Sequence, residues 1–379
     1  MPILDKPSST STHSPSLSDE KPQEQTTTWA WLGTVVCMVL NSSCAIMWMT
    51  ASSTPTVMAD WMAISLTQLN WLSNGSAILN ALVSFITPLA YDKLGIRSSL
   101  ILCGLLNALG CWVRTLAILV PIEKRYALFM TGQMIASLGG PLVYNLFPSG
   151  LHPKIEDWPA FCYLLVVSGL STLAALPTFL IPPQPAVPPC VSATLARDSL
   201  WHGLRSIATH AQFGWLTLMT SVTIGMILSV SVLIMEAIAP FGYSDQQAGL
   251  CAASVVFAGC LGGVIPNAFA TVLVACIING FFSYALLPIY IELAAEMTYP
   301  ISESISSSLL WGFTTIAMLI FSIVIDALRA GPEASPPNNM NLSMVVVAVI
   351  VGVGNLPCLW LKGELNRLKE DQHEEQGFP

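Results

Sequence analysis

Acidic residues inside or beside long apolar runs are the side chains of this sequence that could do chemistry. Glu236 lies near the end of one run, and Glu292, Glu296 and Glu303 lie where another run ends and the next begins. A carboxylate in such a place can bind a cationic group, carry a coupling proton, or lie at a membrane interface. The five histidines lie outside the runs and, like the ten cysteines, lack metal-ligand spacing, so we expect no metal and no cofactor.

Polar residues also recur at helical spacing inside three of the apolar runs. Such a stripe faces a water-filled cavity, or it lets two helices approach closely. Three stripes in one chain favour a cavity, and from them we take Asn80, Ser229, Glu236, Glu303 and Thr315 as candidate solute-binding residues. The stripes consist of Ser73, Ser76, Asn80 and Ser84; of Ser221, Gly225, Ser229 and Glu236; and of Ser304, Ser308, Trp311 and Thr315 beside Glu303.

The composition predicts that these stripes lie in a membrane. Of the 379 residues, 54% are hydrophobic and 9% are charged, whereas an average soluble domain has about 25% charged residues. The mean hydropathy is +0.66, and the net charge of −8 does not suit a nucleic-acid partner. No Gly-rich phosphate loop and no nucleophile elbow occur, so we expect neither ATP-driven pumping nor an enzyme. The partners expected are the lipid bilayer, a small organic solute, and a coupling ion or proton.

The apolar runs predict an all-α membrane protein, a polytopic bundle with about ten recognisable spans of about 20 residues each. These spans divide into an N-terminal half at 29–182 and a C-terminal half at 213–361, joined by a linker at 183–212. We expect cytoplasmic tails at 1–28, which is disordered, and at 362–379. The predicted spans are 29–52, 70–91, 98–120, 127–149, 159–182, 213–240, 248–265, 268–290, 304–327 and 342–361.

Charge and loop length single out two junctions in this arrangement. Lys93 and Arg97 place the turn at 92–97 in the cytoplasm. Strict alternation of the spans would then put the linker outside, although Arg197 and Arg205 favour the inside. In the C-terminal half, two spans are joined by only a short turn near 262–267. Both features would disappear if one span were missing before residue 159 and another near residue 266; a tight helical hairpin is the alternative at the second junction.

Several motifs resemble those of known transporters. The segment PLAYDKLGIRSSL, with Asp92, Gly95 and Arg97, resembles the loop between the second and third helices of major facilitator proteins. The segments QLNWLSN (68–74), NALGCWVR (107–114) and ELAAEMTYPISESISSSLL (292–310) resemble the feline leukaemia virus subgroup C receptor-related family. That family has twelve helices in two halves around a central cavity. This chain resembles such a protein without the fifth helix and most of the ninth.

The resemblance implies roles for individual residues. It implies that Trp48 packs on the solute, whereas an ordinary tryptophan of the membrane interface is the alternative. Leu228 and Thr315 stand where the family has an aromatic residue and a glutamine, which argues against a choline cage. Asp92, Gly95 and Arg97 are expected to form a gate, with Glu292 and Glu296 pairing with bases such as Arg97. Glu292 and Glu296 could instead lie on a solvated helix end.

Taken together, these features predict a secondary-active or facilitative carrier of a small organic solute, or an exporter of a metabolite. A receptor-like or truncated inactive membrane protein is the alternative, and a membrane enzyme built on the Glu292, Glu296 and Glu303 group ranks third. We expect the plasma membrane rather than the vacuole or another internal membrane. A sequon at Asn341 is expected to face outward as a glycosylation site.

Overall fold

A computed structural model describes residues 28–52, 55–141, 160–180, 200–241, 268–361 and 365–369, and the described part is helical without strands. Five described helices are long and apolar enough to cross a membrane, with α3 counted once, and the stretch Leu164–Leu180 is apolar but shorter. The α-helices are α1 (Thr28–Met49), α2 (Pro55–Met62), α3 (Leu66–Leu116), α4 (Ile122–Ser137), α6 (Ala160–Ala175), α7 (Leu200–Thr209), α8 (Ala211–Ile238), α10 (Ala268–Thr298), α11 (Glu303–Ala327) and α12 (Asn341–Gly354). The predicted span 248–265 lies outside the described residues.

Helix α3 consists of two antiparallel helices that meet at Gly95. Its 51 residues would be about 77 Å long as one straight helix, more than twice the thickness of a bilayer core. Gly95 has φ 76° and ψ 164°, a left-handed backbone conformation that glycine adopts at low cost. Leu72 from the first part and Ala117 just after the second lie in one cluster with Phe129 of α4. The predicted spans 70–91 and 98–120 and the turn between them are therefore present.

Helices α4 and α6 both run antiparallel to the second part of α3. A Cβ added at Gly110 would lie 2.5 Å from the Ala136 nitrogen, and one at Gly139 would lie 2.8 Å from the Cys103 carbonyl oxygen. On α6, Ser168 shares a 2.8 Å hydrogen bond with Thr115. In the 3₁₀ turn Leu176–Leu180 that follows α6, the Phe179 carbonyl accepts a hydrogen bond from Arg97. Hence α4 and α6 run in the same direction. Consecutive membrane spans must run in opposite directions, so this geometry agrees with a span missing before residue 159.

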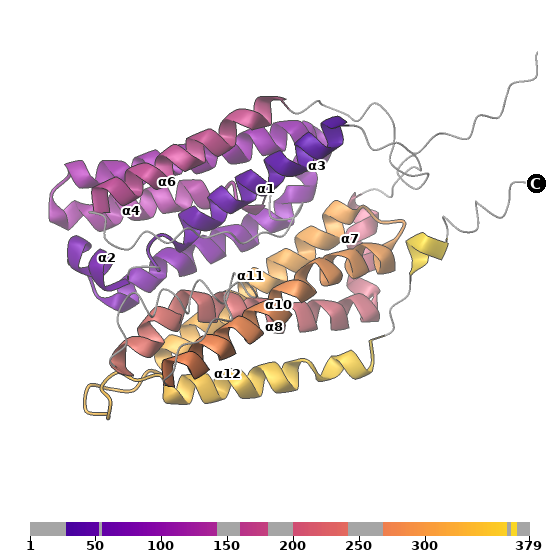
Figure 1. Ribbon diagram of the computed structural model, residues 1–379. Helices are drawn as coiled ribbons and strands as arrows, with labels where there is room; N and C mark the ends of the chain where they lie inside the picture. The colour runs from indigo at the N-terminus through magenta and orange to yellow at the C-terminus, as the bar shows by residue number, and fades with distance from the viewer. Residues whose placement is uncertain are drawn as a thin grey trace, which may run out of the picture.

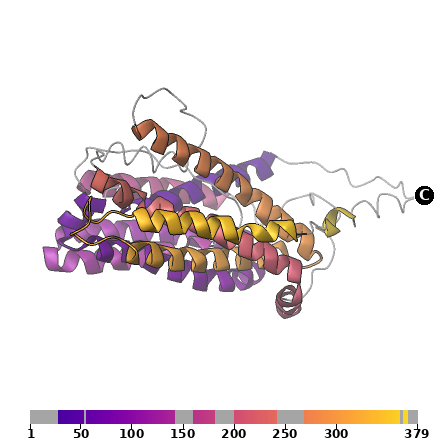
Figure 2. The same cartoon turned by 90° about the horizontal axis from the view of Figure 1, so that it is seen from below.

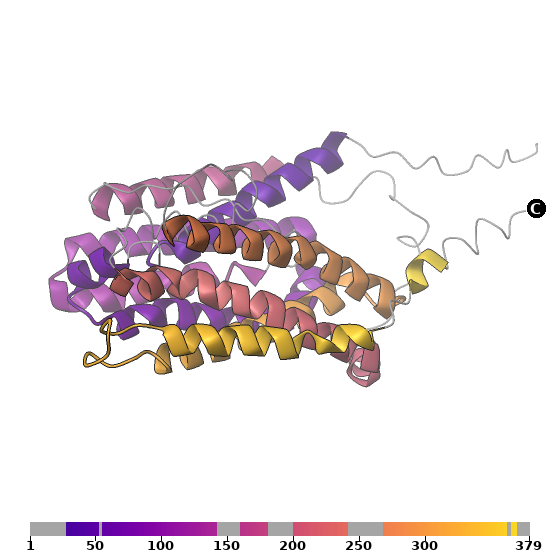
Figure 3. The same ribbon diagram turned by 60° about the horizontal axis from the view of Figure 1, so that its bottom comes forward.

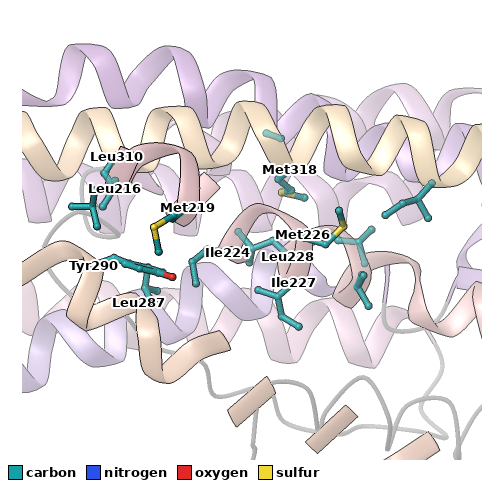
Figure 4. Packing of buried hydrophobic residues seen from close by; sticks show 14 of the residues in the cluster. Leu216, Met219, Ile224, Met226, Ile227, Leu228, Leu287, Tyr290, Leu310 and Met318 are labelled. Carbon is teal, nitrogen blue, oxygen red and sulfur yellow. The ribbon is translucent and has the colours of Figure 1, made fainter. Parts of the chain in front are cut away.

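The C-terminal half is built around α8. Figure 4 shows Tyr290 and Leu287 of α10 near Met219 and Ile224 of α8, and Ile207 and Met297 line one cavity. Helices α8 and α10 are therefore antiparallel, which requires an even number of spans between them. The sequence predicts a single span there, at 248–265, which is an odd number, so this geometry agrees with a span missing near residue 266.

The two halves face each other across α3 and α11. In Figure 1 the N-terminal half (indigo to magenta) lies above the C-terminal half (red to yellow). The rings of Phe85 on α3 and Phe313 on α11 meet edge to face with centroids 5.7 Å apart. Figure 2 shows α12 on the side of the C-terminal half that faces away from the N-terminal half, where it packs on α8 and α11.

The bundle has two ends, which we name after a residue at each. Helix α3 runs from Leu66 toward Gly95, and α11 runs from Glu303 toward Arg329. Leu66 and Arg329 line one cavity together with Glu236. This is the Glu236 end; Gly95, Phe179 and Glu303 lie toward the other, the Gly95 end.

Two short helices were not predicted. Helix α2 follows α1 at the Glu236 end, and α7 lies within residues 183–212, which we predicted to be a linker. Helix α7 is amphipathic: Gly203 and Ile207 are buried, and an added Cβ at Gly203 would lie 2.9 Å from Ile301. A search for runs of about 20 apolar residues misses helices of 8 and 10 residues.

Candidate functional site

A buried polar group joins the two halves at the Glu236 end. Glu236, whose side chain is 2% exposed, forms an ion pair with Arg329. Arg329 also binds Asp326 at 2.7 Å, so one guanidinium serves two carboxylates. From the N-terminal half, the Asn70 amide donates to Glu236 at 3.4 Å. We call these four residues the Glu236 cluster.

The charge of Arg329 is secured by this arrangement. Burial lowers the pKa of Arg329, but the neighbouring carboxylates of Glu236 and Asp326 outweigh burial and raise that pKa above its ordinary value. The guanidinium therefore remains charged, and Glu236 is held mainly by a partner within its own half. The hydrogen bond from Asn70 is the contact that crosses between the halves.

A cavity of about 230 Å³ adjoins the Glu236 cluster. Pro55, Thr56 and Leu66 contribute to its wall from the N-terminal half. Met235, Glu236, Pro240, Arg329, Pro337 and Asn338 contribute from the C-terminal half. The cavity therefore lies between the halves, at the end where Asn70 reaches Glu236.

Trp48 and Asn80 bring unpaired polar atoms to the contact between the halves. Trp48 packs against a cluster of the N-terminal half and also against the large core of the C-terminal half. Its buried indole nitrogen has no hydrogen-bond partner among the described residues, and neither has the buried Asn80 Oδ1. Asn80 lies one turn after Ala77, which belongs to that C-terminal core. These atoms can still bind a polar group of a solute.

The hydroxyl groups of Ser229 and Thr315 are engaged inside the C-terminal half. The Ser229 hydroxyl lies 2.8 Å from the carbonyl oxygens of both Gly225 and Met318, which share its one hydrogen as acceptors. The Thr315 hydroxyl likewise has the carbonyl oxygens of Trp311 and Gly312 as its acceptors. In this conformation these two hydroxyl groups serve helix packing, the alternative that the sequence left open.

Leu228 occupies an apolar environment. Figure 4 shows it with Met226 and Ile227 on α8, facing Met318 on α11. The large core that holds these residues also includes Leu216 and Leu310. No aromatic side chain opposes Trp48 from this position.

The candidate gate residues Asp92, Gly95 and Arg97 lie together in the turn of α3. They do not make the ion pairs with acidic residues of α10 that the sequence predicts. Asp92 and Gly95 are exposed, and Arg97 donates to the Phe179 carbonyl at 3.1 Å. The predicted pairing of Arg97 with Glu292 or Glu296 is absent from the described residues. Arg97 instead holds the end of α6, because the antiparallel packing of α3 and α6 brings that carbonyl within reach.

Two acidic residues, one near the end of α10 and one at the start of α11, contact the C-terminal segment at 365–369. Arg367 forms a 2.9 Å ion pair with Glu303, and the Leu368 amide donates to Glu296 at 3.2 Å. Glu292 is exposed. Glu303 lies in the first turn of α11 and its side chain is 47% exposed, so it lies at the Gly95 end and not midway along the helix.

The sequon residue Asn341 is exposed at the start of α12. The hydroxyl of Ser343 in the same sequon is buried and donates to the Ile325 carbonyl at 2.8 Å.

The sequence reasoning missed Asn70, Asp326, Arg329 and Arg367. Asp326 and Arg329 stand at i and i+3, directly after a predicted span. With a span missing near residue 266, helix direction places them at the same membrane face as Glu236, whereas strict alternation of the ten predicted spans places them at the opposite face. The spacing of Asp326 and Arg329, taken together with the helix directions, could have predicted the Glu236 cluster.

No family model matches the chain, but sequence relatives are found among transporters. Solute carrier family 49 member A3 of Danio rerio is 27% identical over 380 aligned positions, covering 81% of this chain and 80% of the relative. The choline/ethanolamine transporter FLVCR2 of Homo sapiens is 22% identical over 427 positions, covering 91% of this chain and 79% of the relative. An alignment of 427 positions exceeds the 379 residues of this chain. The relative therefore has internal residues that this chain lacks.

Solved structures identify the fold. The chain matches a D-xylose–proton symporter with a TM-score of 0.58 at 13% identity, covering 88% of this chain and 97% of that one. It matches the fucose:proton symporter of E. coli with a TM-score of 0.53 at 14% identity, covering 86% and 99%. This chain is thus a multi-pass membrane protein with the major facilitator fold, and its sequence resembles the feline leukaemia virus subgroup C receptor-related family.

Proposed function

We propose that this protein is a secondary-active or facilitative carrier that moves a small organic solute by alternating exposure of a site between its halves. The observation that carries the proposal is the pair of buried polar atoms without partners, Trp48 Nε1 and Asn80 Oδ1, at the contact between the halves. An unpaired buried polar atom costs about 1–3 kcal/mol. Binding a solute with complementary polar groups would recover that free energy.

The Glu236 cluster acts as the gate on the outer face in this proposal. The positive-inside rule assigns the Gly95 end to the cytoplasm, because Lys93 and Arg97 lie there, and it assigns the Glu236 end to the outside. The hydrogen bond between Asn70 and Glu236 then closes the outer side, and it must break when the halves rock apart. A proton that neutralises Glu236 would weaken this contact, so a proton is the coupling ion that we propose.

The solute class is taken from the named relatives. The name of the human relative FLVCR2 cites choline and ethanolamine, so these two cations head the panel, although Leu228 leaves Trp48 without an aromatic partner. We expect a less tightly caged amine or another small metabolite to be the better solute. The direction that we propose is export, across the plasma membrane.

The test is transport by purified protein in proteoliposomes, with radiolabelled choline, ethanolamine and a panel of small metabolites. Trp48→Ala should abolish movement of whichever solute is carried. Trp71→Ala, an exposed tryptophan on α3, is the matched control and should retain transport. If Trp48→Ala and Trp71→Ala transport equally well, the site is elsewhere.

A second candidate function is that of a receptor-like or inactive membrane protein. The parallel course of α4 and α6 favours it, because a helix that should help to enclose the central cavity is then absent. Monodisperse protein that binds and moves no solute of the panel would support this second candidate and overturn the first.

A further inference from the structure

A short C-terminal segment packs on the acidic residues where α10 ends and α11 begins, and the transport proposal assigns no role to this contact. Residues 365–369 of the chain lie against it, 64 residues away in sequence from Glu303 at the Arg367 contact. In Figures 1 and 3 this short yellow turn stands at the same end of the bundle as α7, clear of the lower face formed by α12.

Three contacts of different kinds fix the segment. Arg367 forms the ion pair with Glu303, and the Leu368 backbone amide donates to the Glu296 carboxylate. The Asn366 side chain donates to the Met297 carbonyl at 3.3 Å. Side chain and backbone both contribute, so the segment has a defined orientation on this surface and is not held by charge alone.

The same segment lines a cavity together with the helix that connects the two halves. A cavity of about 120 Å³ is lined by Asn366, by Met297–Ile301 of the α10–α11 turn, and by Ser206, Ile207 and His210 at the end of α7. Helix α7 packs on the same turn through Gly203, beside Ile301 and Ile305. Three parts of the chain, distant in sequence, therefore converge around one small cavity.

We infer that residues 365–369 are an intramolecular strap, which holds α7 against the α10–α11 turn at the Gly95 end of the C-terminal half. Glu296 and Glu303 are its anchoring residues rather than parts of the solute site. By fixing α7, the strap restrains the connection between the two halves. The strap does not depend on the chain being a competent carrier.

The test compares Arg367→Gln with Lys369→Gln in the full-length protein in nanodiscs. Both substitutions remove one positive charge, but Lys369 is exposed two residues further on, whereas Arg367 makes the ion pair. Amide hydrogen exchange is followed in residues 365–369, in the turn 298–303 and in α7. Partly exposed ion pairs contribute about 0.2–1 kcal/mol, so Arg367→Gln should raise the exchange rate by about 1.4-fold to fivefold.

The strap predicts faster exchange in all three segments for Arg367→Gln and little change for Lys369→Gln. The charge reversal Arg367→Glu combined with Glu303→Arg should restore slow exchange. Faster exchange confined to 365–369, or equal effects of the two glutamine variants, would overturn the proposal. Because exchange is measured without a solute, failure of transport would leave this result unaffected.

Discussion

Removing Arg329 should destabilise the protein far more than neutralising Glu236. In Arg329→Gln, the carboxylate of Glu236 keeps its negative charge, is 2% exposed, and loses its cation. Breaking a buried pair from one side costs about 3–5 kcal/mol, and we expect about 3 because Arg329 itself is 17% exposed. In Glu236→Gln, Arg329 still binds Asp326, and the new amide can still meet Asn70. That change should cost about 1 kcal/mol, the contribution of one hydrogen bond.

The assay is thermal unfolding of the two variants, followed by fluorescence-detected size-exclusion chromatography. Arg329→Gln should unfold at a clearly lower temperature than Glu236→Gln. The double variant Arg329→Gln with Glu236→Gln should recover most of the loss, because the carboxylate that remains without its cation, that of Asp326, is 16% exposed rather than fully buried. Equal unfolding temperatures for the two single variants would refute the reasoning, since Glu236 would then not be a buried charge that depends on Arg329.

Three further predictions concern positions where the geometry is specific. Gly110→Val should destabilise the protein by more than the roughly 1–3 kcal/mol of ordinary overpacking, because a Cβ added at Gly110 would lie 2.5 Å from backbone atoms of α4. Gly169→Val is the control, because a Cβ added at Gly169 has no atom within 4 Å. Equal thermal stability of the two variants would contradict the packing of α3 on α4. Gly95→Ala should lower the free energy of unfolding by about 1–2 kcal/mol, because Gly95 has a positive φ. Gly33→Ala should leave the stability unchanged or raise it. The same thermal unfolding assay distinguishes the two variants. Asn70→Ala should increase about fivefold the rate at which maleimide labels a cysteine placed in the cavity beside the Glu236 cluster, because a hydrogen bond of about 1 kcal/mol is lost. An unchanged labelling rate would show that this hydrogen bond does not close the gate.

The membrane class and the positions of the described spans follow directly from the apolar runs, because a bilayer imposes helix length and internal hydrogen bonding. The turn at Gly95 was also predictable, since its glycine, charge and position between two runs all agree. The two junctions were visible as well, from charge in one case and from loop length in the other, and the helix directions agree with both.

The partners of the polar residues could not be predicted from one sequence. Ser76 illustrates this: it accepts hydrogen bonds from Gln133 and Ser137 of α4, so its stripe serves packing at that point, whereas Asn80 one turn later keeps an unpaired oxygen. Periodicity gives the face of a helix but not the neighbour of that face. The ion pair of Glu303 could not be predicted for the same reason, because its partner Arg367 lies beyond all the predicted spans.

The central claim, that the halves move as those of a carrier, is tested most directly by the distance between them at the Glu236 end. Spin labels at Thr56→Cys in the N-terminal half and Glu333→Cys in the C-terminal half, both exposed positions, report that distance in nanodiscs by double electron–electron resonance. Alternating exposure predicts two distance populations, with the longer one enriched by Asn70→Ala, which removes the hydrogen bond between the halves, or by acidic pH. A single narrow distance that none of these conditions changes would contradict the account and favour an inactive bundle.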